Sequence, residues 1–146
     1  MIRYCICAWG GACKTLLIAV ERAQRAVLKV LMFLPYRHPT TSVYAKAEVL
    51  SVRRIYIMET VRRYHRHTIP TLPLDETKRV ITCPIPRVRT HFAQKHYSAR
   101  APRFYNALNK VIKTRKFNHH QLKRALIAWL KDFDYEGTEN LLNIAK

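Results

Sequence analysis

The chain has 146 residues and a formal net charge of +18, because 27 Lys or Arg stand against 9 Asp or Glu. This length suits one domain or two small halves, and a hydrophobic fraction of 49% excludes a wholly disordered chain. Only three glycines are present, which disfavours glycine-rich phosphate loops and glycine-punctuated sheets. The apolar runs at 16–20 and 30–34 are far too short to cross a bilayer, so we expect no membrane partner.

Residues 1–12 begin with apolar side chains that no helix cap or turn precedes. Tyr4, Ile6 and Trp9 belong to this stretch, and the pair Gly10-Gly11 then interrupts it. We expect residues 1–12 to be the remnant of an upstream region, with apolar side chains that lack a packing partner.

A long helix is predicted over 13–33, ending before Pro35, because the residue that precedes a proline avoids helical geometry. Apolar residues at three- and four-residue spacing predict its core-facing side, with Gln24 as one polar gap. These residues are Leu16, Leu17, Val20, Val27, Leu28 and Leu31. Much of the other side is charged, with Glu21, Arg22, Arg25 and Lys29.

Two more helices complete the N-terminal half, residues 13–67. Thr40 or Thr41 is expected to cap a short helix near 41–47, and Ser51 to cap a helix over 52–67. A proline-rich stretch over 68–89 then excludes helix, and we expect it to be an extended linker. Its prolines are Pro70, Pro73, Pro84 and Pro86.

The C-terminal half, residues 90–146, is predicted to hold a short helix near Thr90, a helix over 102–112 and another after the cap residue Asn118. Pro102 is expected in the first turn of its helix. We expect Gly137 to end the helix after Asn118, and Thr138 to cap a last helix over 139–145. The predicted fold is therefore all-α, with about five or six helices in two halves joined by the proline-rich linker.

No pattern in the sequence indicates catalysis, a cofactor or a metal site. Polymerases and nucleases that use two metal ions need clustered carboxylates, whereas the nine acids here are scattered. The stretch from Asp132 to Gly137 resembles the start of a calcium loop, but Asn143 stands where that loop needs a bidentate Glu. The four cysteines lack zinc-site spacing, and no signal peptide is recognisable, so we expect free thiols in an intracellular, reducing compartment.

Basic residues dominate the C-terminal half. No acid occurs between Glu76 and Asp132, and fourteen Lys or Arg do, an imbalance that repels itself unless an anion lies on it. Nucleic acid offers anions densely, about one per 1.7 Å of duplex axis. An acidic protein partner and an ordinary basic surface are the alternatives. The candidate phosphate-binding residues are Arg53, Arg54, Arg62, Arg63, Arg87, Arg89, Lys95, Arg100, Arg103, Lys113, Arg115 and Lys116.

Aromatic residues lie among these bases, and exposed rings can stack on nucleotide bases. The pairs of neighbours include Tyr56 and Tyr64, Phe92 and Tyr97, and Phe104 and Tyr105. Aromatics at helical spacing belong to a core more often than to a stacking surface, so both interpretations stay open.

Several segments, in order along the chain, carry a resemblance to a known family. They are Tyr4 with Trp9-Gly10-Gly11, Gln24 to Lys29, Pro35 to Thr40, Val49 to Arg53 with Tyr56, Arg87 to Thr90, Ala101 to Asn106 and Tyr135 to Leu142. Together they resemble the C-terminal, thumb-side region that follows the polymerase core in reverse transcriptases of insect non-LTR retrotransposons of the jockey type.

The resemblance implies RNA-directed DNA polymerase activity for a full-length parent. The Tyr-Ala-Asp-Asp-type catalytic signature has no counterpart in this chain, so no catalytic residue carries over. We expect a non-catalytic fragment that binds RNA or DNA with little sequence dependence, and the upstream polymerase core is a second candidate partner. Two alternatives remain: a structural scaffold that docks on that core, and a decayed remnant without function.

Overall fold

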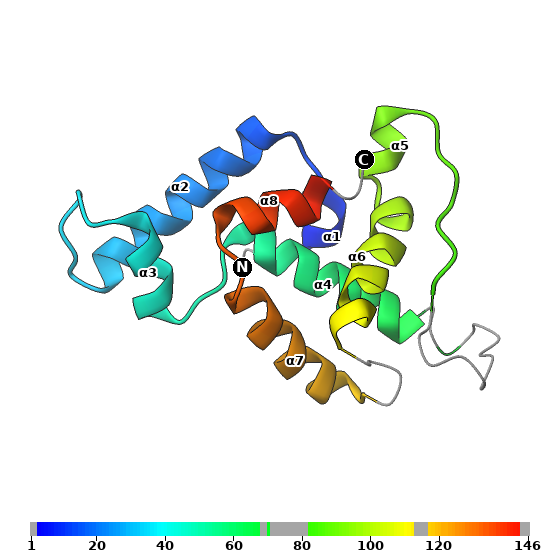
Figure 1. Cartoon of the computed structure of the whole chain (residues 1–146). Coiled ribbons are helices and arrows are strands. Elements are labelled where there is room, and N and C mark those ends of the chain that lie inside the picture. The colour runs from blue at the N-terminus through cyan, green and yellow to red at the C-terminus, as the bar shows by residue number, and fades with distance from the viewer. Residues whose placement is uncertain (1–2, 68–69, 71–81, 113–116, 144–146) are drawn as a thin grey trace.

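A computed structural model of the chain describes residues 3–67, 70, 82–112 and 117–143, and these ranges contain helices but no strand (Figure 1). The all-α prediction is therefore confirmed for the described residues, although they form more helices than the five or six expected. The helices are α1 (Ile6–Trp9), α2 (Lys14–Leu31), α3 (Thr40–Ala47), α4 (Val52–His67), α5 (His91–Lys95), α6 (Tyr97–Val111), α7 (His119–Lys131) and α8 (Tyr135–Asn143). None of these helices is long and apolar enough to cross a membrane.

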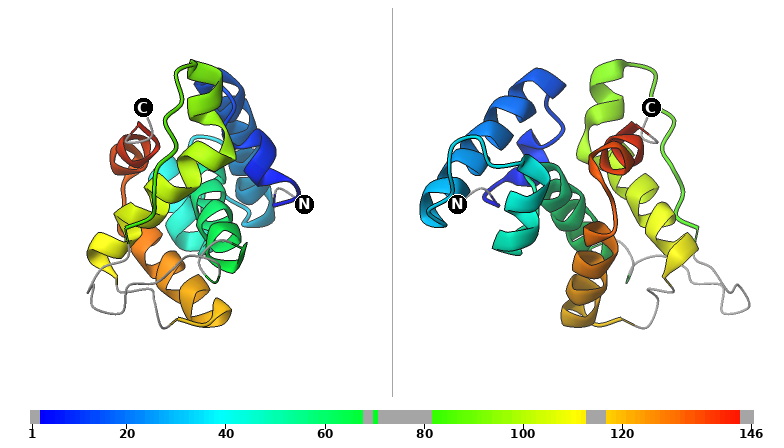
Figure 2. Two further views of the ribbon diagram at one scale, coloured as in Figure 1. Left: turned by 90° about the vertical axis from the view of Figure 1, so that its right-hand side faces the viewer. Right: turned by 60° about the vertical axis from the view of Figure 1, so that its left-hand side comes forward.

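Helix α4 lies at the centre of the molecule and contacts α1, α2, α6, α7 and α8 (Figure 2). It is buried on most sides, because its apolar residues surround the axis: Val52, Ile55, Tyr56, Ile57, Met58, Val61 and Tyr64. One cluster of buried side chains joins α4 to Phe104 and Leu108 of α6 and to Leu122 and Leu126 of α7. The two halves predicted from the sequence thus share a single core.

The end of the expected linker is tied to this core. Residues 68–69 and 71–81 of the linker lie outside the described ranges, whereas 82–89 contain neither helix nor strand. Cys83 is 1% exposed, and the Asn106 side chain accepts its backbone N–H at 2.8 Å and donates to its carbonyl at 2.9 Å. Because a side-chain amide matches both backbone groups, Asn106 holds the segment against α6.

The N-terminal segment is packed on α4, so the expectation that its apolar side chains lack a partner is wrong. Ile6 is 1% exposed and belongs to the core cluster, and Trp9 packs against that cluster. Gly10 is in contact with the Tyr56 ring: a Cβ added there would lie 2.3 Å from the ring's Cδ2 atom. A bulkier residue at this position would hold α1 away from α4.

The side of α2 that faces the body lies along one edge of the predicted stripe, at Leu17 and Gln24, and the rest of the stripe is not buried. Of the expected inward stripe, Leu17 is buried, whereas Leu16, Val27 and Leu31 are 61%, 58% and 68% exposed. The buried residues of α2 are Leu17, Glu21 and Gln24. With α3 it forms a helical hairpin, which we call the α2–α3 arm and which projects from the body in Figure 1.

Hydrogen bonding explains why the polar side chain of Gln24 is buried. Gln24 Oε1 accepts the backbone N–H of Val52, at the first residue of α4, at 3.1 Å. The Gln24 amide also donates to the Leu50 carbonyl at 3.0 Å, and Tyr44 donates to Gln24 Oε1 at 3.2 Å. The first N–H groups of a helix have no partner within it, so Gln24 satisfies a group that burial would otherwise leave unpaired.

Two predicted caps are confirmed, whereas a third predicted cap and two predicted boundaries are wrong. Thr40 and Thr41 lie inside α3, whose N-cap is Pro39, so neither threonine caps it. Ser51 precedes α4, and Asn118 forms a capping box with Gln121 at the start of α7. Helix α6 begins five residues before Pro102, which therefore lies inside it. Gly137 lies inside α8 rather than ending a helix, because Asp134 Oδ1 accepts its N–H at 2.5 Å and caps α8 in place of Thr138.

Candidate nucleic-acid interface

The acidic residues of the described ranges are concentrated away from most of the basic ones. Three of them are held in ion pairs: Glu21 with Arg53, Glu139 with Arg53 and Lys14, and Glu59 with Arg3 and Arg62. The other four lie at the end of α3 and around the α7–α8 turn: Glu48, Asp132, Asp134 and Glu136. The described residues 82–112 contain no acid, so α5, α6 and the segment before them are purely basic.

A cationic cluster forms where the C-terminal end of α4 meets the start of α7. The guanidinium groups of Arg62 and Arg66 both point at His119 Nε2, at 2.5 and 3.1 Å. Guanidinium is only a donor, so His119 accepts both bonds on an unprotonated Nε2. Burial lowers the pKa of His119, and the neighbouring charges of Arg62 and Arg66 lower it further. Among the described residues, Glu59 offsets part of this charge, because it pairs with Arg62 at 2.9 Å.

Further exposed bases lie at Arg63 and in the segment before α5. Arg63 is exposed, and its guanidinium lies 5.2 Å from the centre of the Tyr97 ring, close enough for a cation–π contact. Arg87 and Arg89 are exposed in the acid-free segment that leads to α5, and Lys95 at the end of α5 is half-buried. We call Arg63, Arg66, Arg87 and Arg89 the exposed arginine group.

Arg100 and Arg103 of α6 are less exposed to solvent than the exposed arginine group. Both are half-buried, and each has one buried guanidinium nitrogen without a hydrogen-bond partner, Nε in Arg100 and Nη1 in Arg103. Arg100 lies 6.0 Å from the centre of the Tyr56 ring, so part of its surface covers the core. Lys113, Arg115 and Lys116 lie outside the described residues.

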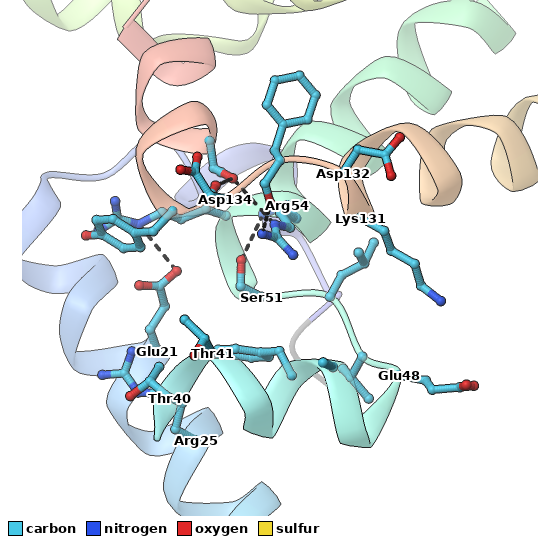
Figure 3. Close-up of a pocket in the computed structure, with 18 residues that line it drawn as sticks. Glu21, Arg25, Thr40, Thr41, Glu48, Ser51, Arg54, Lys131, Asp132 and Asp134 are labelled. Carbon is cyan, nitrogen blue, oxygen red and sulfur yellow. Dashed lines mark hydrogen bonds and ion pairs between the residues drawn. The ribbon is translucent and has the colours of Figure 1, made fainter. Parts of the chain in front are cut away.

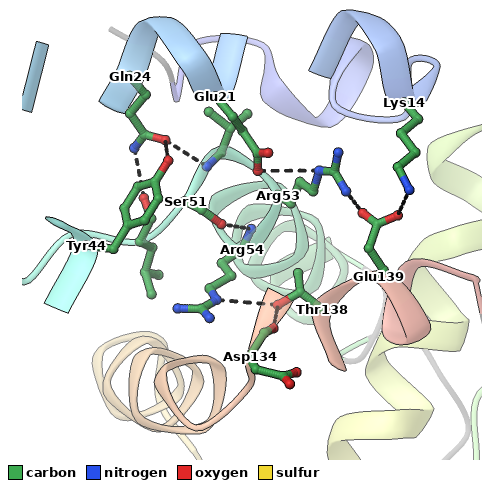
Figure 4. A network of polar contacts seen from close by, with 12 residues as sticks. Lys14, Glu21, Gln24, Tyr44, Ser51, Arg53, Arg54, Asp134, Thr138 and Glu139 are labelled. Atoms are coloured by element: carbon green, nitrogen blue, oxygen red, sulfur yellow. Dashed lines mark hydrogen bonds and ion pairs between the residues drawn. The ribbon is translucent and has the colours of Figure 1, made fainter. Parts of the chain in front are cut away.

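Arg53 and Arg54 do not fit the predicted role of surface phosphate contacts. Arg53 is 2% exposed and pairs with Glu21 at 3.4 Å and with Glu139, as Figure 4 shows. Burial raises the pKa of Glu21, although Arg53 opposes that shift. Arg54 donates to the Phe133 carbonyl and, at 3.4 Å, to Thr138 Oγ1, and burial lowers its pKa. Both arginines join secondary-structure elements to one another.

Most of the aromatic candidates for base stacking are core residues. Tyr56, Tyr64, Phe104 and Tyr105 are buried, and they contact one another in edge-on or tilted pairs. Phe92 of α5 is different, because it is 84% exposed and lies between Arg89 and Lys95 in the sequence. It is the aromatic candidate that the described structure leaves accessible for stacking.

A cavity of about 610 Å³ opens elsewhere, between the α2–α3 arm and the α7–α8 turn (Figure 3). Four acids and four bases line it, together with several hydroxyl and apolar groups. The charged residues are Glu21, Glu48, Asp132, Asp134, Arg25, Arg53, Arg54 and Lys131. Balanced charge does not favour a polyanion, so the cavity is not part of the candidate interface.

The histidines were not identified as site residues from the sequence. His65 contacts the Tyr105 hydroxyl at 3.0 Å and the Phe117 carbonyl at 3.2 Å, and burial lowers its pKa. The available signal was the position of His119 directly after the cap residue Asn118, which places it at the positive end of a helix. The contacts of His119 with Arg62 and Arg66 depend on tertiary packing, so the sequence shows no sign of them.

Among the described residues, no group of three or more His, Cys, Asp or Glu is arranged to hold a metal ion. No family model, no curated protein and no solved structure matches this chain.

Proposed function

We propose that this chain binds nucleic acid through the exposed arginine group and the Arg62–Arg66–His119 cluster, and that it has no catalytic activity of its own. The observation that carries the proposal is the separation of charge. The described acids are either paired with arginines or gathered near the α3 end and the α7–α8 turn, so the basic end has little negative charge to neutralise it.

The chemistry of this end fits a phosphate backbone better than a base sequence. Arginine forks bind phosphate oxygens in two-point contacts, and such contacts position a protein without reading bases. Phe92 adds one exposed ring that can stack on an unpaired base. We therefore infer weak sequence dependence, with RNA and DNA both accepted.

The resemblance to jockey-type reverse transcriptases gives this binding a context. In a parent enzyme, a basic helical region after the polymerase core would hold template RNA or target DNA. The catalytic steps would belong to the core, because this chain lacks the clustered carboxylates that bind two metal ions.

The experiment measures binding of a fluorescent duplex and a fluorescent single strand by anisotropy, at NaCl from about 0.05 to 0.2 M. The test variant changes Arg63, Arg66, Arg87 and Arg89 to Glu. Counterion release predicts that the log–log salt slope for duplex flattens by up to about 3.6, at roughly 0.9 for each phosphate that the variant no longer neutralises. All four residues are exposed, so helical content should be unchanged.

The matched control changes four exposed bases at other sites, Arg22, Arg37, Lys46 and Lys131, to Glu. It alters the net charge by the same amount, so it isolates the position of the charge from its total. We expect its salt slope to stay near that of the wild type. Equal slopes for both variants would reject the proposed face, and the scaffold interpretation would then be preferred.

A further inference from the structure

The Arg62–Arg66–His119 cluster differs from the rest of the basic end, because its cations converge on one point instead of spreading over a surface. Arg62 Nη2 and Arg66 Nη2 lie 2.5 and 3.1 Å from the same atom, His119 Nε2. Like charges repel, so two guanidinium groups that meet in this way favour an acceptor between them. The lone pair of a neutral imidazole occupies that position here, and an anionic oxygen accepts such bonds more strongly.

Contacts on α4 fix the direction of the Arg62 side chain. Glu59 accepts two hydrogen bonds from Arg62 Nη1, at 2.9 and 3.1 Å, so Nη2 stays turned toward His119. Arg3 also donates to Glu59, at 2.9 Å, so that carboxylate is shared between two cations. With Arg3 counted, three guanidinium groups against one carboxylate leave a net charge of +2 around the neutral His119 ring.

The start of α7 adds positive potential from a second element. His119 is the first residue of this 13-residue helix, whose dipole places partial positive charge at that end. Asn118 Oδ1 accepts the N–H groups of His120 and Gln121, at 3.1 and 2.9 Å. The helix therefore contributes potential, whereas the side chains of the cluster supply the hydrogen-bond donors.

The number of donors and the charge favour a phosphate at the end of a strand over one within it. A phosphodiester carries one negative charge and is covered by an ester bond on two sides. A phosphate monoester carries about −1.5 to −2 at neutral pH and exposes three acceptor oxygens. Arg62 Nη2, Arg66 Nη2 and the Nε2–H of a protonated His119 are three donors for these oxygens. The dianion also matches the net charge of +2, which a diester leaves half unbalanced.

We infer that the Arg62–Arg66–His119 cluster binds the terminal phosphate monoester of a nucleic-acid strand. The inference rests on the proposed function, because the exposed arginine group would hold the phosphodiesters that follow the strand's end. On binding, a phosphate oxygen replaces His119 Nε2 as the acceptor for both arginines. The imidazole then takes up one proton from the solvent at Nε2 and donates it in a hydrogen bond to another phosphate oxygen.

The surroundings of His119 determine how this proton uptake depends on pH. Within the described residues, the charged and titratable groups that face the ring are Arg62, Arg66 and Glu59 from α4 and His120 from its own helix. The two arginines and His120 oppose protonation of the free ring, and Glu59 favours it. A bound dianion removes much of that opposition, so the phosphorylated strand should bind together with a proton.

The test compares three strands of about eight nucleotides, labelled with a fluorophore at the 3′ end, by anisotropy at about 0.1 M NaCl. The first has a 5′-phosphate, the second a 5′-hydroxyl, and the third a 5′-hydroxyl and two further nucleotides, which add similar charge as diesters. At pH 7 the wild type should bind the phosphorylated strand about tenfold more tightly than the lengthened one, the effect of one hydrogen bond to a charged group. Because binding takes up a proton, this preference should decrease as pH rises from about 7 to 8.5.

Variants locate the preference within the basic end. Arg66→Gln, at an exposed position, should abolish it, because one of the converging donors is lost. His119→Gln should retain part of the preference with little pH dependence, because glutamine does not titrate. The matched control is Arg89→Gln, which removes the same charge from an exposed position outside the cluster. It should weaken the binding of all three strands by a similar factor, so their ratio stays at the wild-type value.

Inorganic phosphate carries the same chemistry without a strand, so it distinguishes a strand end from a free phosphate. It should displace the labelled phosphorylated strand only at concentrations far above those at which the unlabelled phosphorylated strand does so. Equal potency of these two competitors, a wild type without the preference, or Arg66→Gln with the wild-type preference would each overturn the inference. The proposed function is judged separately, by the salt slopes of its own two variants, so either can fail without the other.

Discussion

The contact between the α2–α3 arm and the body differs in chemistry from the interior of the body itself. Around α4, α6 and α7 most buried residues are apolar. The arm adds Leu17 to this core, but it also meets α4 through the buried polar groups of Glu21, Gln24 and Arg53. Apolar packing is tolerant of partners, because any side chain of suitable size fills the space. Buried polar contacts are stable only when each partner is present, so the arm's position depends on a few matched groups.

The largest effect should follow removal of the central cation of this contact. Arg53→Met leaves Glu21, whose side chain is 5% exposed, without its cation, and leaves Glu139 paired with Lys14 alone. Removing one member of a buried ion pair costs about 3–5 kcal/mol, because the other charge remains desolvated. Chemical denaturation should show this decrease in the free energy of unfolding.

The companion variant changes Arg53 to Met together with Glu21→Gln and Glu139→Gln. It removes the stranded charges as well as the cation, and it should recover much of the stability that Arg53→Met alone removes. If the single and the triple variants are equally unstable, the guanidinium stabilises the fold by its packing volume. The stranded carboxylates would then not be the cause of the lost stability.

A second variant tests the apolar side of the comparison. Ile6→Ala removes a buried side chain from the contact of α1 with α4, and we expect a decrease of about 2–3 kcal/mol in the free energy of unfolding. The exposed Leu16→Ala on α2 is the control, with a change near zero. A neutral Ile6→Ala would instead show that the contact of α1 with α4 contributes little to stability.

Local signals in the sequence were sufficient for the helices and several of their caps. Proline at 35, serine at 51 and asparagine at 118 act through neighbouring backbone, so their effect is readable without tertiary structure. The inward side of α2 was not predictable in this way. The helix does have an apolar stripe, but periodicity shows only that one side of a helix is apolar. It does not show whether that side packs against the rest of the chain. Gln24 faces inward because its side chain accepts the N–H of Val52, at the start of α4, which has no partner within that helix.

The candidate interface was predictable to a similar degree. The net charge and the acid-free run identified the basic C-terminal half, because charge is a property of composition. Separating Arg63, which is exposed, from Arg53, which is buried ten residues earlier on the same helix, needed the packing of α2 and α8 on α4. Sequence spacing alone does not distinguish the two residues.

The smallest expected effect concerns pH at the basic end. Burial and the guanidinium groups of Arg62 and Arg66 lower the pKa of His119 below its usual 6.5. As pH falls through about 6.5, the unfolded chain binds a proton at this histidine before the folded chain does, so the free energy of unfolding decreases. His65, whose pKa burial also lowers, shifts stability in the same direction. Stability should therefore be nearly constant between about pH 7 and 8 and fall in mild acid.

Replacing His119 with Gln sharpens this prediction, because glutamine accepts hydrogen bonds from Arg62 and Arg66 but does not titrate. Urea titrations at several pH values between about 5 and 8 should show a shallower fall for His119→Gln than for the wild type, with His65 supplying what remains. His91→Gln, at an exposed position on α5, should leave the wild-type profile unchanged. Bound nucleic acid would oppose the lowering of the His119 pKa, since phosphates near Arg62 and Arg66 favour the protonated ring. A duplex added in saturating amount should thus reduce the acid-induced decrease in stability, and an identical decrease with and without duplex would place the phosphates away from this cluster.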